Sequence, residues 1–281
     1  MNVPDRTLAA LDNAAEHHRT AWAGGTMTWR SWGTGEPLVL LHGDFGSWTH
    51  WFRNIEPLAE RYRVIAADMP GYGQSDMPEG DYTTERVAAI LSTGLAEILP
   101  PPQPYRLAGF SFGGIVAGHL AARDGKRVSH LALIGPGGFG IHRADQLPAV
   151  RRPPRNPTPA DIAETHRANL AALMIGDPAQ VDDLAIHIQH ENIRRARARC
   201  GAIPETDALW RVLPDVTARL SGIWGTRDAF AGPHTPTVTA MLRDLRHDID
   251  IRLIDGAGHW VIYEAADSVN AMLLEMLTAE G

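Results

Sequence analysis

Short apolar runs alternate with amphipathic segments along most of the chain. The runs at 37–41, 63–68 and 128–134 carry few polar side chains, which predicts strands buried on both faces of a parallel sheet. Segment 83–99 shows helical spacing of its apolar residues and ends at consecutive prolines. Residues 26–32 alternate between polar and apolar positions, which predicts a half-exposed strand.

Strand and helix patterns return near the end of the chain. Residues 218–225 and 249–254 predict further strands, and 265–277 predicts the last helix. Alternating strands and helices imply an α/β fold with a mostly parallel sheet and helices on both of its faces. We therefore expect one α/β core domain made of residues 1–141 and 215–281.

The stretch between these two parts, residues 142–214, lacks the apolar runs of buried strands. A linker rich in proline and arginine, 148–159, precedes two predicted helices at 160–174 and 181–200. We interpret 142–214 as a helical cap inserted after the carboxyl end of a strand, where ligands bind in open α/β sheets.

The N-terminal segment 7–18 predicts an amphipathic helix, with Leu8, Leu11 and Ala15 on one side. Two roles stay open for this helix. It packs in the interface of a homodimer, or it covers the fold of a single chain.

Composition narrows the classes of function. The 281 residues are 44% hydrophobic, which is enough for a full core. A net charge of −7 gives no reason to expect nucleic acid as a partner. Cys200 is the single cysteine, so an intramolecular disulfide is excluded and zinc bound by Cys and His is not expected. With no apolar stretch resembling a signal peptide or a membrane span, we expect a cytoplasmic protein.

The clearest chemical signal is Ser111, which stands between Gly109 and Gly113. A predicted strand, 105–108, precedes it and a predicted helix, 115–122, follows it. This arrangement is the G-x-S-x-G nucleophile elbow, in which a strained turn presents the serine hydroxyl above the sheet. We therefore predict that Ser111 is a nucleophile rather than part of an ordinary glycine-rich turn.

A serine hydroxyl needs a base, and the base needs an orienting acid. His259 follows the last predicted strand, and Asp228 follows the strand before it, so both lie at the sheet edge that carries Ser111. The chain order Ser111, Asp228, His259 is the order of α/β-hydrolases. The alternative interpretations are that His259 is an ordinary loop histidine and that Asp228 is a carboxylate in a solvated turn.

An oxyanion hole needs two backbone donors. We predict the amide of Phe112 as one donor and that of Asp44 as the other, with Phe45 as the second choice. The Asp44 carboxylate would oppose a neighbouring oxyanion. It either turns away to cap local backbone or binds a polar group of the substrate.

With these motifs the chain resembles the α/β-hydrolases over nearly its whole length. Within that superfamily it is most similar to the meta-cleavage-product hydrolases, which cut a C–C bond in 2-hydroxy-6-oxo-dienoates. The similarity rests on His42-Gly43 with 48–58, on cap residues 169–178 and 194–197, and on Gly258-His259-Trp260 with Glu264. The resemblance implies that Trp260 lines the active site.

The chain departs from that family at three points. Phe110 precedes the nucleophile where the family has asparagine, and the oxyanion loop contains Asp44 and Phe45. The cap arginine that would meet the substrate carboxylate has no counterpart at 189–192, although Arg194 and Arg195 follow one turn later. Besides Arg194 and Arg195, we take Phe45, Phe110 and Trp260 as candidate substrate-binding residues. The alternative for the two arginines is an outward, solvated helix face.

These observations predict a serine hydrolase that needs no cofactor or metal, acts on a small molecule and does not bind a membrane. The leading expectation is C–C bond hydrolysis of a 2-hydroxy-6-oxo-dienoate-like compound. A carboxylesterase or lactonase with the same three residues is the first alternative. A catalytically idle scaffold that binds a small hydrophobic ligand is the second.

Overall fold

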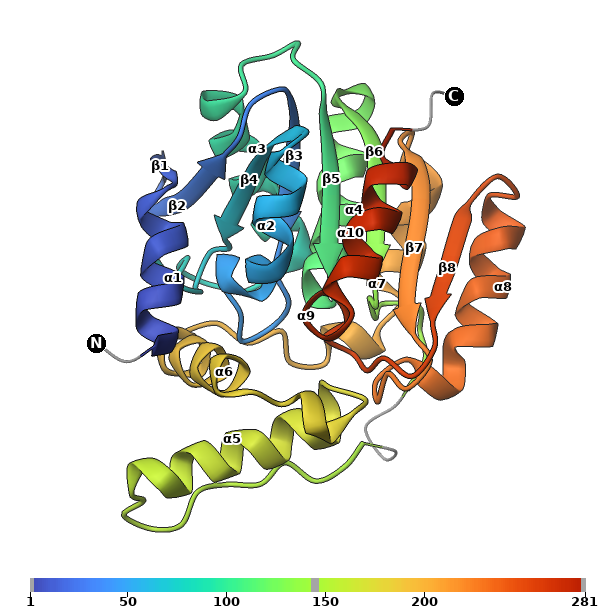
Figure 1. The fold of residues 1–281 in the computed structure, drawn as a ribbon. Helices are drawn as coiled ribbons and strands as arrows, with labels where there is room; N and C mark the ends of the chain where they lie inside the picture. Colours follow the sequence, from blue (N-terminus) through green and yellow to red (C-terminus); the bar gives the residue numbers. More distant parts are fainter. Residues whose placement is uncertain (1–2, 143–146, 279–281) are drawn as a thin grey trace.

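The computed structural model describes residues 3–142 and 147–278, and its described strands form one eight-stranded sheet (Figure 1). The strand order is β1-β2-β4-β3-β5-β6-β7-β8. The bounds are β1 Glu16–Trp22, β2 Gly25–Trp32, β3 Glu36–Leu41, β4 Tyr62–Asp68, β5 Tyr105–Phe110, β6 Val128–Ile134, β7 Arg219–Gly225 and β8 Asp250–Ile254. Among the described strands, β2 pairs in antiparallel fashion with both β1 and β4, and the other five pairings are parallel, so the predicted mostly parallel sheet is confirmed.

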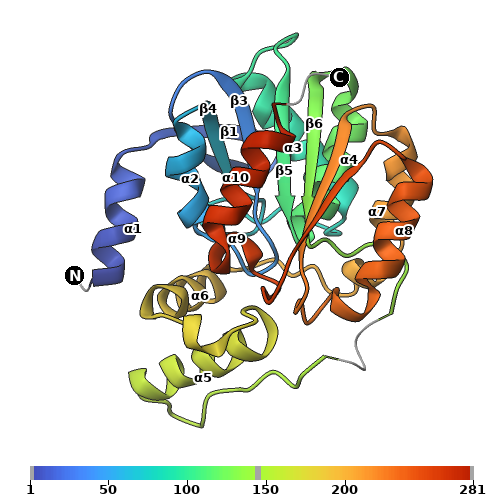
Figure 2. The same cartoon turned by 45° about the vertical axis from the view of Figure 1, so that its right-hand side comes forward.

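Helices cover both faces of the sheet (Figures 1 and 2). The bounds are α1 Val3–Asn13, α2 Phe52–Ala59, α3 Thr84–Ile98, α4 Phe112–Asp124, α5 Pro159–Leu173, α6 Asp183–Arg195, α7 Ala208–Val212, α8 Thr235–Leu245, α9 Val261–Glu264 and α10 Ala266–Met276. Helices α3, α4 and α8 contribute to one apolar cluster, and α2, α9 and α10 contribute to the other. The sheet therefore lies between two hydrophobic layers, as an α/β fold requires.

Strand β3 shows how the apolar runs produce this arrangement. Its residues from Leu38 to Leu41 are all fully buried. Val39 and Leu41 belong to the cluster on one face, whereas Leu38 and Leu40 belong to the other. Successive side chains of a strand point to opposite faces, so a strand covered on both sides must be apolar at every position.

The cap helices begin at side chains that accept hydrogen bonds from free backbone amides. Thr158 and Asp161 form a capping box at the start of α5, and Asp182 accepts a hydrogen bond from the amide of Ala185 at the start of α6. Both helices lie below the carboxyl edge of the sheet in the view of Figure 1. The start of the predicted cap involves residues 143–146, which lie outside the described residues, so the cap boundaries stay a prediction.

Two predicted helices end earlier than expected. The helix predicted at 7–18 ends at Asn13, because the following residues form β1 and pair with β2. The helix predicted at 181–200 ends at Arg195, and the amides of Arg197 and Ala198 then donate to the carbonyl oxygen of Gly71. In both places another segment satisfies backbone groups that a helix would otherwise bond internally: the next strand in the first case and a loop distant in sequence in the second.

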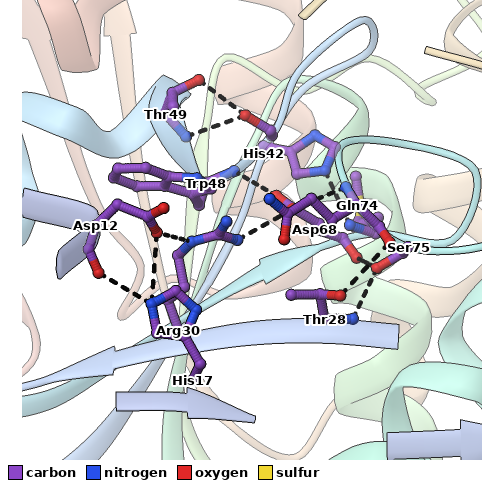
Figure 3. A network of polar contacts seen from close by, with 12 residues as sticks. Asp12, His17, Thr28, Arg30, His42, Trp48, Thr49, Asp68, Gln74 and Ser75 are labelled. Carbon is purple, nitrogen blue, oxygen red and sulfur yellow. Dashed lines mark hydrogen bonds and ion pairs between the residues drawn. The ribbon is translucent and has the colours of Figure 1, made fainter. Parts of the chain in front are cut away.

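The predicted half exposure of strand β2 is wrong, because most of its residues are buried. The polar side chains are buried in a hydrogen-bonded network rather than solvated (Figure 3). The guanidinium of Arg30 pairs with Asp12 and, at 3.1 Å, with Asp68, and it lies over the ring of Trp48. The Asp68 carboxylate also accepts the backbone amides of Trp48 and Gln74 at 3.0 Å each.

Two histidines in the segment after β3 are buried. His42 accepts a hydrogen bond from the Met69 amide at Nε2, and His50 accepts one from the Gly43 amide at Nδ1. Burial lowers the pKa of His42, and burial lowers the pKa of His50 to well below its ordinary value. Both rings are therefore neutral in the folded protein.

Among the described residues, no helix combines the length and the apolar character needed to cross a lipid bilayer.

Replacing Arg30 tests the buried network. Arg30→Ala leaves the buried Asp68 without its counter-charge, and breaking a buried pair in this way costs about 3–5 kcal/mol of unfolding free energy. Arg211→Ala is the control, because Arg211 pairs with Asp207 on an exposed helix face and its loss costs less than about 1 kcal/mol. Urea denaturation of both variants measures the difference, and equal losses would contradict the network's role.

The buried histidines predict acid sensitivity. Below the ordinary histidine pKa of about 6.5, His42 and His50 bind protons in the unfolded chain but stay neutral in the folded chain. The unfolding free energy therefore falls as the pH falls from 7.5 to 5. In His50→Asn the amide oxygen can still accept from Gly43, but the titrating ring is gone. The unfolding free energy of this variant should depend less steeply on pH than that of the wild type. If the two profiles of unfolding free energy against pH were parallel, His50 would not contribute to the acid sensitivity.

Candidate active site

Ser111 occupies a strained turn between β5 and α4. Its φ of 54° and ψ of −121° lie in a region that side chains rarely adopt. A Cβ atom at Gly109 would lie 2.4 Å from the carbonyl oxygen of Gly113, and one at Gly113 would lie 2.3 Å from that of His42. Glycine is therefore required at both positions, as the elbow motif predicts.

The structure brings Ser111, His259 and Asp228 together in one hydrogen-bonded chain. Oγ of Ser111 lies 2.9 Å from Nε2 of His259, and Nδ1 of His259 lies 2.8 Å from Oδ2 of Asp228. The imidazole and the carboxylate are both buried, with residue exposures of 4% and 2%. All three residues stand at the carboxyl edge of the sheet, where sequence order and strand pattern predict them.

The loop after β7 fixes the Asp228 carboxylate. Its Oδ1 accepts the backbone amides of Phe230 and Ala231 at 2.7 and 2.9 Å, which leaves Oδ2 for His259. Gly135, in the loop after β6, approaches the pair closely: a Cβ atom there would lie 3.2 Å from Oδ2 of Asp228. The carboxylate is thus oriented by backbone donors and neighbouring chain rather than by solvent.

Aromatic rings hold the imidazole of His259. The ring of Phe110 lies 5.1 Å from it and that of Phe230 lies 4.5 Å from it, centroid to centroid. Trp260 packs against His50 and donates its indole N–H to the His50 carbonyl oxygen. Phe110 and Trp260 are fully buried, so in this structure both rings support the site from behind instead of presenting a free surface to a substrate.

The loop after β3 lies directly against the elbow. A Cβ atom at Gly43 would lie 3.1 Å from Cβ of Ser111. Phe112 is the first residue of α4, and amides in the first turn of a helix lack a carbonyl partner within it. The two predicted oxyanion donors, the amides of Phe112 and Asp44, therefore belong to segments that meet at Ser111.

The Asp44 side chain turns away to cap local backbone, one of the two options left open by the sequence. Its Oδ1 accepts the Phe45 amide at 3.0 Å and the Tyr72 hydroxyl at 2.5 Å. Cys200 donates its backbone amide to Oδ1 and its thiol to Oδ2, at 3.4 and 3.0 Å. Because the Phe45 amide is engaged with this carboxylate, the second choice of oxyanion donor is less favourable than the Asp44 amide.

The expectation that Arg194 and Arg195 reach the substrate finds no support in the structure. Both guanidinium groups pair with Glu191 on α6, at 2.8 and 3.2 Å, and their side chains are 59% and 44% exposed. Arginine and glutamate three and four residues apart share one helix face, so these charges satisfy one another on the surface.

Sequence patterns missed Cys200 and Phe230. They contact the site only through the folded chain, and neither of them belongs to a local motif around Ser111, Asp228 or His259. Within the described parts of the chain, no three His, Cys, Asp or Glu side chains gather as metal ligands.

Known proteins share this fold, and some are similar in sequence over most of the chain. The family described as alpha/beta hydrolase fold matches residues 36–175. A 2-hydroxy-6-oxo-6-phenylhexa-2,4-dienoate hydrolase of Burkholderia cepacia is 28% identical over 260 residues, covering 87% of this chain and 88% of that protein.

Two solved structures show the same architecture. The meta-cleavage product hydrolase CumD of Pseudomonas fluorescens IP01 has a TM-score of 0.72 at 22% identity, covering 92% of this chain and 97% of that one. The carboxylesterase CesB of Bacillus subtilis has a TM-score of 0.74 at 18% identity, covering 99% and 96%. Together with the sheet topology, these matches show that the chain has the α/β-hydrolase fold and is similar to the meta-cleavage product hydrolases.

Proposed function

We propose that this protein is a serine hydrolase in which Ser111 attacks the carbonyl carbon of a small-molecule substrate. The observation that carries the proposal is the continuous hydrogen-bonded chain from Ser111 through His259 to Asp228 at a strained elbow. Such an arrangement of nucleophile, base and orienting acid is recognised by its geometry. The same arrangement argues against a catalytically idle scaffold, because binding a ligand requires no nucleophile, base and acid in line.

His259 acts as the general base. Its Nδ1–H donates to Asp228, which leaves Nε2 as the acceptor that takes the proton from the Ser111 hydroxyl. Asp228 holds the ring in this tautomer and stabilises the imidazolium that forms. Its two backbone donors keep the carboxylate correctly oriented during this step.

The amides of Phe112 and Asp44 stabilise the negative charge on the carbonyl oxygen of the tetrahedral intermediate. Collapse of the intermediate breaks the bond to the leaving group, which takes the proton from His259. Water, activated by His259, then attacks the acyl group on Ser111 and releases the acid. With a dienol ketone as substrate, His259 first helps to move the enol proton to carbon, so that the C–C bond has an electron sink.

The substrate we infer is a 2-hydroxy-6-oxo-dienoate-like ketone, cleaved at a C–C bond. The similarity of the chain to a dienoate hydrolase across 87% of its length supports this choice. A carboxylic ester or a lactone is the second candidate. The position of Arg194 and Arg195 favours it, because both guanidinium groups pair with Glu191 on the surface instead of standing ready to bind a substrate carboxylate.

Replacing the three residues tests the proposed mechanism. Ser111→Ala should lower kcat by at least about 10³-fold, and Asp228→Asn by about 10⁴-fold, because the amide holds His259 in the wrong tautomer. Circular dichroism and thermal unfolding would show that each variant is folded. Retention of more than a tenth of the wild-type kcat by folded Ser111→Ala would contradict the proposal.

A pair of substrates tests which bond is cut. Turnover of a 2-hydroxy-6-oxo-dienoate, followed by loss of its visible absorbance, should exceed turnover of a p-nitrophenyl ester in kcat/KM and should disappear in Ser111→Ala. Cleavage of the ester with an untouched dienoate would replace the C–C assignment with the esterase or lactonase alternative.

A further inference from the structure

The segment that follows α6 in the predicted cap, residues 196–200, lies against the loops at the carboxyl edge of the sheet; we call it the strap. The amides of Arg197 and Ala198 donate to the Gly71 carbonyl oxygen at 2.8 and 3.1 Å, in the loop after β4. Just beyond the strap, the Pro204 carbonyl oxygen accepts the Gly138 amide at 2.7 Å, in the loop after β6. The chain is therefore anchored on both sides of the elbow.

Two adjacent strap residues contact two adjacent residues of the loop after β3. Cys200 donates its amide and its thiol to the Asp44 carboxylate. The guanidinium of Arg199 lies 5.7 Å from the ring centroid of Phe45. The contacts are different in kind, a hydrogen-bonded carboxylate and a cation–π pair, but they bind neighbouring points of one loop.

This loop needs such support, because Phe45 has a φ of 49°. A bulky aromatic residue in the left-handed region is strained, and strain of this kind persists only where the surroundings determine the conformation. The Asp44 carboxylate binds the Phe45 amide, while Tyr72 and Cys200 fix that carboxylate. The supports of the strained residue thus come from the strap, from the loop after β4 and from Asp44 itself.

We propose that Arg199 and Cys200 are positioning residues that hold the loop after β3 in the conformation that presents the Asp44 amide to the reacting carbonyl oxygen. The cap segment thereby completes an oxyanion hole whose donors both belong to the core. This inference rests on the proposed function of Ser111. Neither residue touches the reacting atoms; both act through Asp44 and Phe45.

The role predicts a specific kinetic change. Removal of an oxyanion donor costs about 10²–10³ in kcat, and a donor that is displaced rather than removed loses part of that. In the double variant Arg199→Ala/Cys200→Ala, kcat should therefore fall roughly tenfold or more, with KM within about twofold of the wild type. Turnover of a p-nitrophenyl ester, or of the dienoate if only that is cut, provides the measurement.

Conservative variants separate positioning from packing. In Arg199→Lys/Cys200→Ser, a cation remains near the Phe45 ring and a hydroxyl donor replaces the thiol, so most of the lost kcat should return. Arg211→Ala removes an exposed arginine from α7 and serves as the matched control with unchanged kinetics. Thermal unfolding of each variant measures any loss of stability separately.

The other outcomes overturn the inference. A raised KM with unchanged kcat would mean that Arg199 binds the substrate directly. A lower melting temperature with unchanged kcat, or a conservative variant as slow as the double alanine variant, would leave the strap a purely structural role. Ser111→Ala, assayed beside these variants, keeps the two proposals apart, since an active Ser111→Ala would reject the proposed function and not the strap alone.

Discussion

Close approach of backbone around Ser111 is the constraint on which the rest of the site depends. Strand β5, helix α4 and the loop after β3 meet where a Cβ atom at Gly109, Gly113 or Gly43 would lie between 2.3 and 3.1 Å from its neighbours. Side chains at these positions would push the segments apart. Because the glycines permit contact, the serine hydroxyl stands at the edge of the sheet with backbone amides from two segments beside it.

The charges around this point are arranged by the same contacts. A carboxylate next to a developing oxyanion opposes the proposed reaction, yet Asp44 belongs to the oxyanion loop. Its negative charge is directed toward Tyr72 and Cys200. Burial and then the Asp44 charge raise the pKa of both groups, so they remain protonated donors over the physiological range. The hydrogen bonds thus engage the carboxylate with neutral donors of the protein.

The sequence was sufficient to predict the fold class and the meeting of Ser111, Asp228 and His259. Each of these residues follows a predicted strand, and the carboxyl ends of parallel strands share one edge of a sheet. Strand β1 and helix α8 were missed. Only one residue of β1 is buried, and the strand is defined by its pairing with β2. In α8, threonines occupy two of the four buried positions, so its helical spacing shows few apolar residues.

Contacts between segments that are distant in sequence could not be predicted from local sequence patterns. Cys200 and Asp44 are 156 positions apart, and no periodicity links them. The arginines of α6 show the opposite difficulty, because helical spacing places Arg194 and Arg195 near Glu191 but does not tell which way that face points. Only the packing of α6 decides that the pairs lie on the surface.

The most direct test of the central claim is the site of covalent labelling by a fluorophosphonate, mapped by mass spectrometry of the digested protein. The proposed chemistry predicts one adduct per chain, on Ser111, and its loss in His259→Ala, because the hydroxyl is reactive only beside its base. An unlabelled wild type, or an adduct on another residue that persists in Ser111→Ala, would contradict the assignment of Ser111 as the nucleophile.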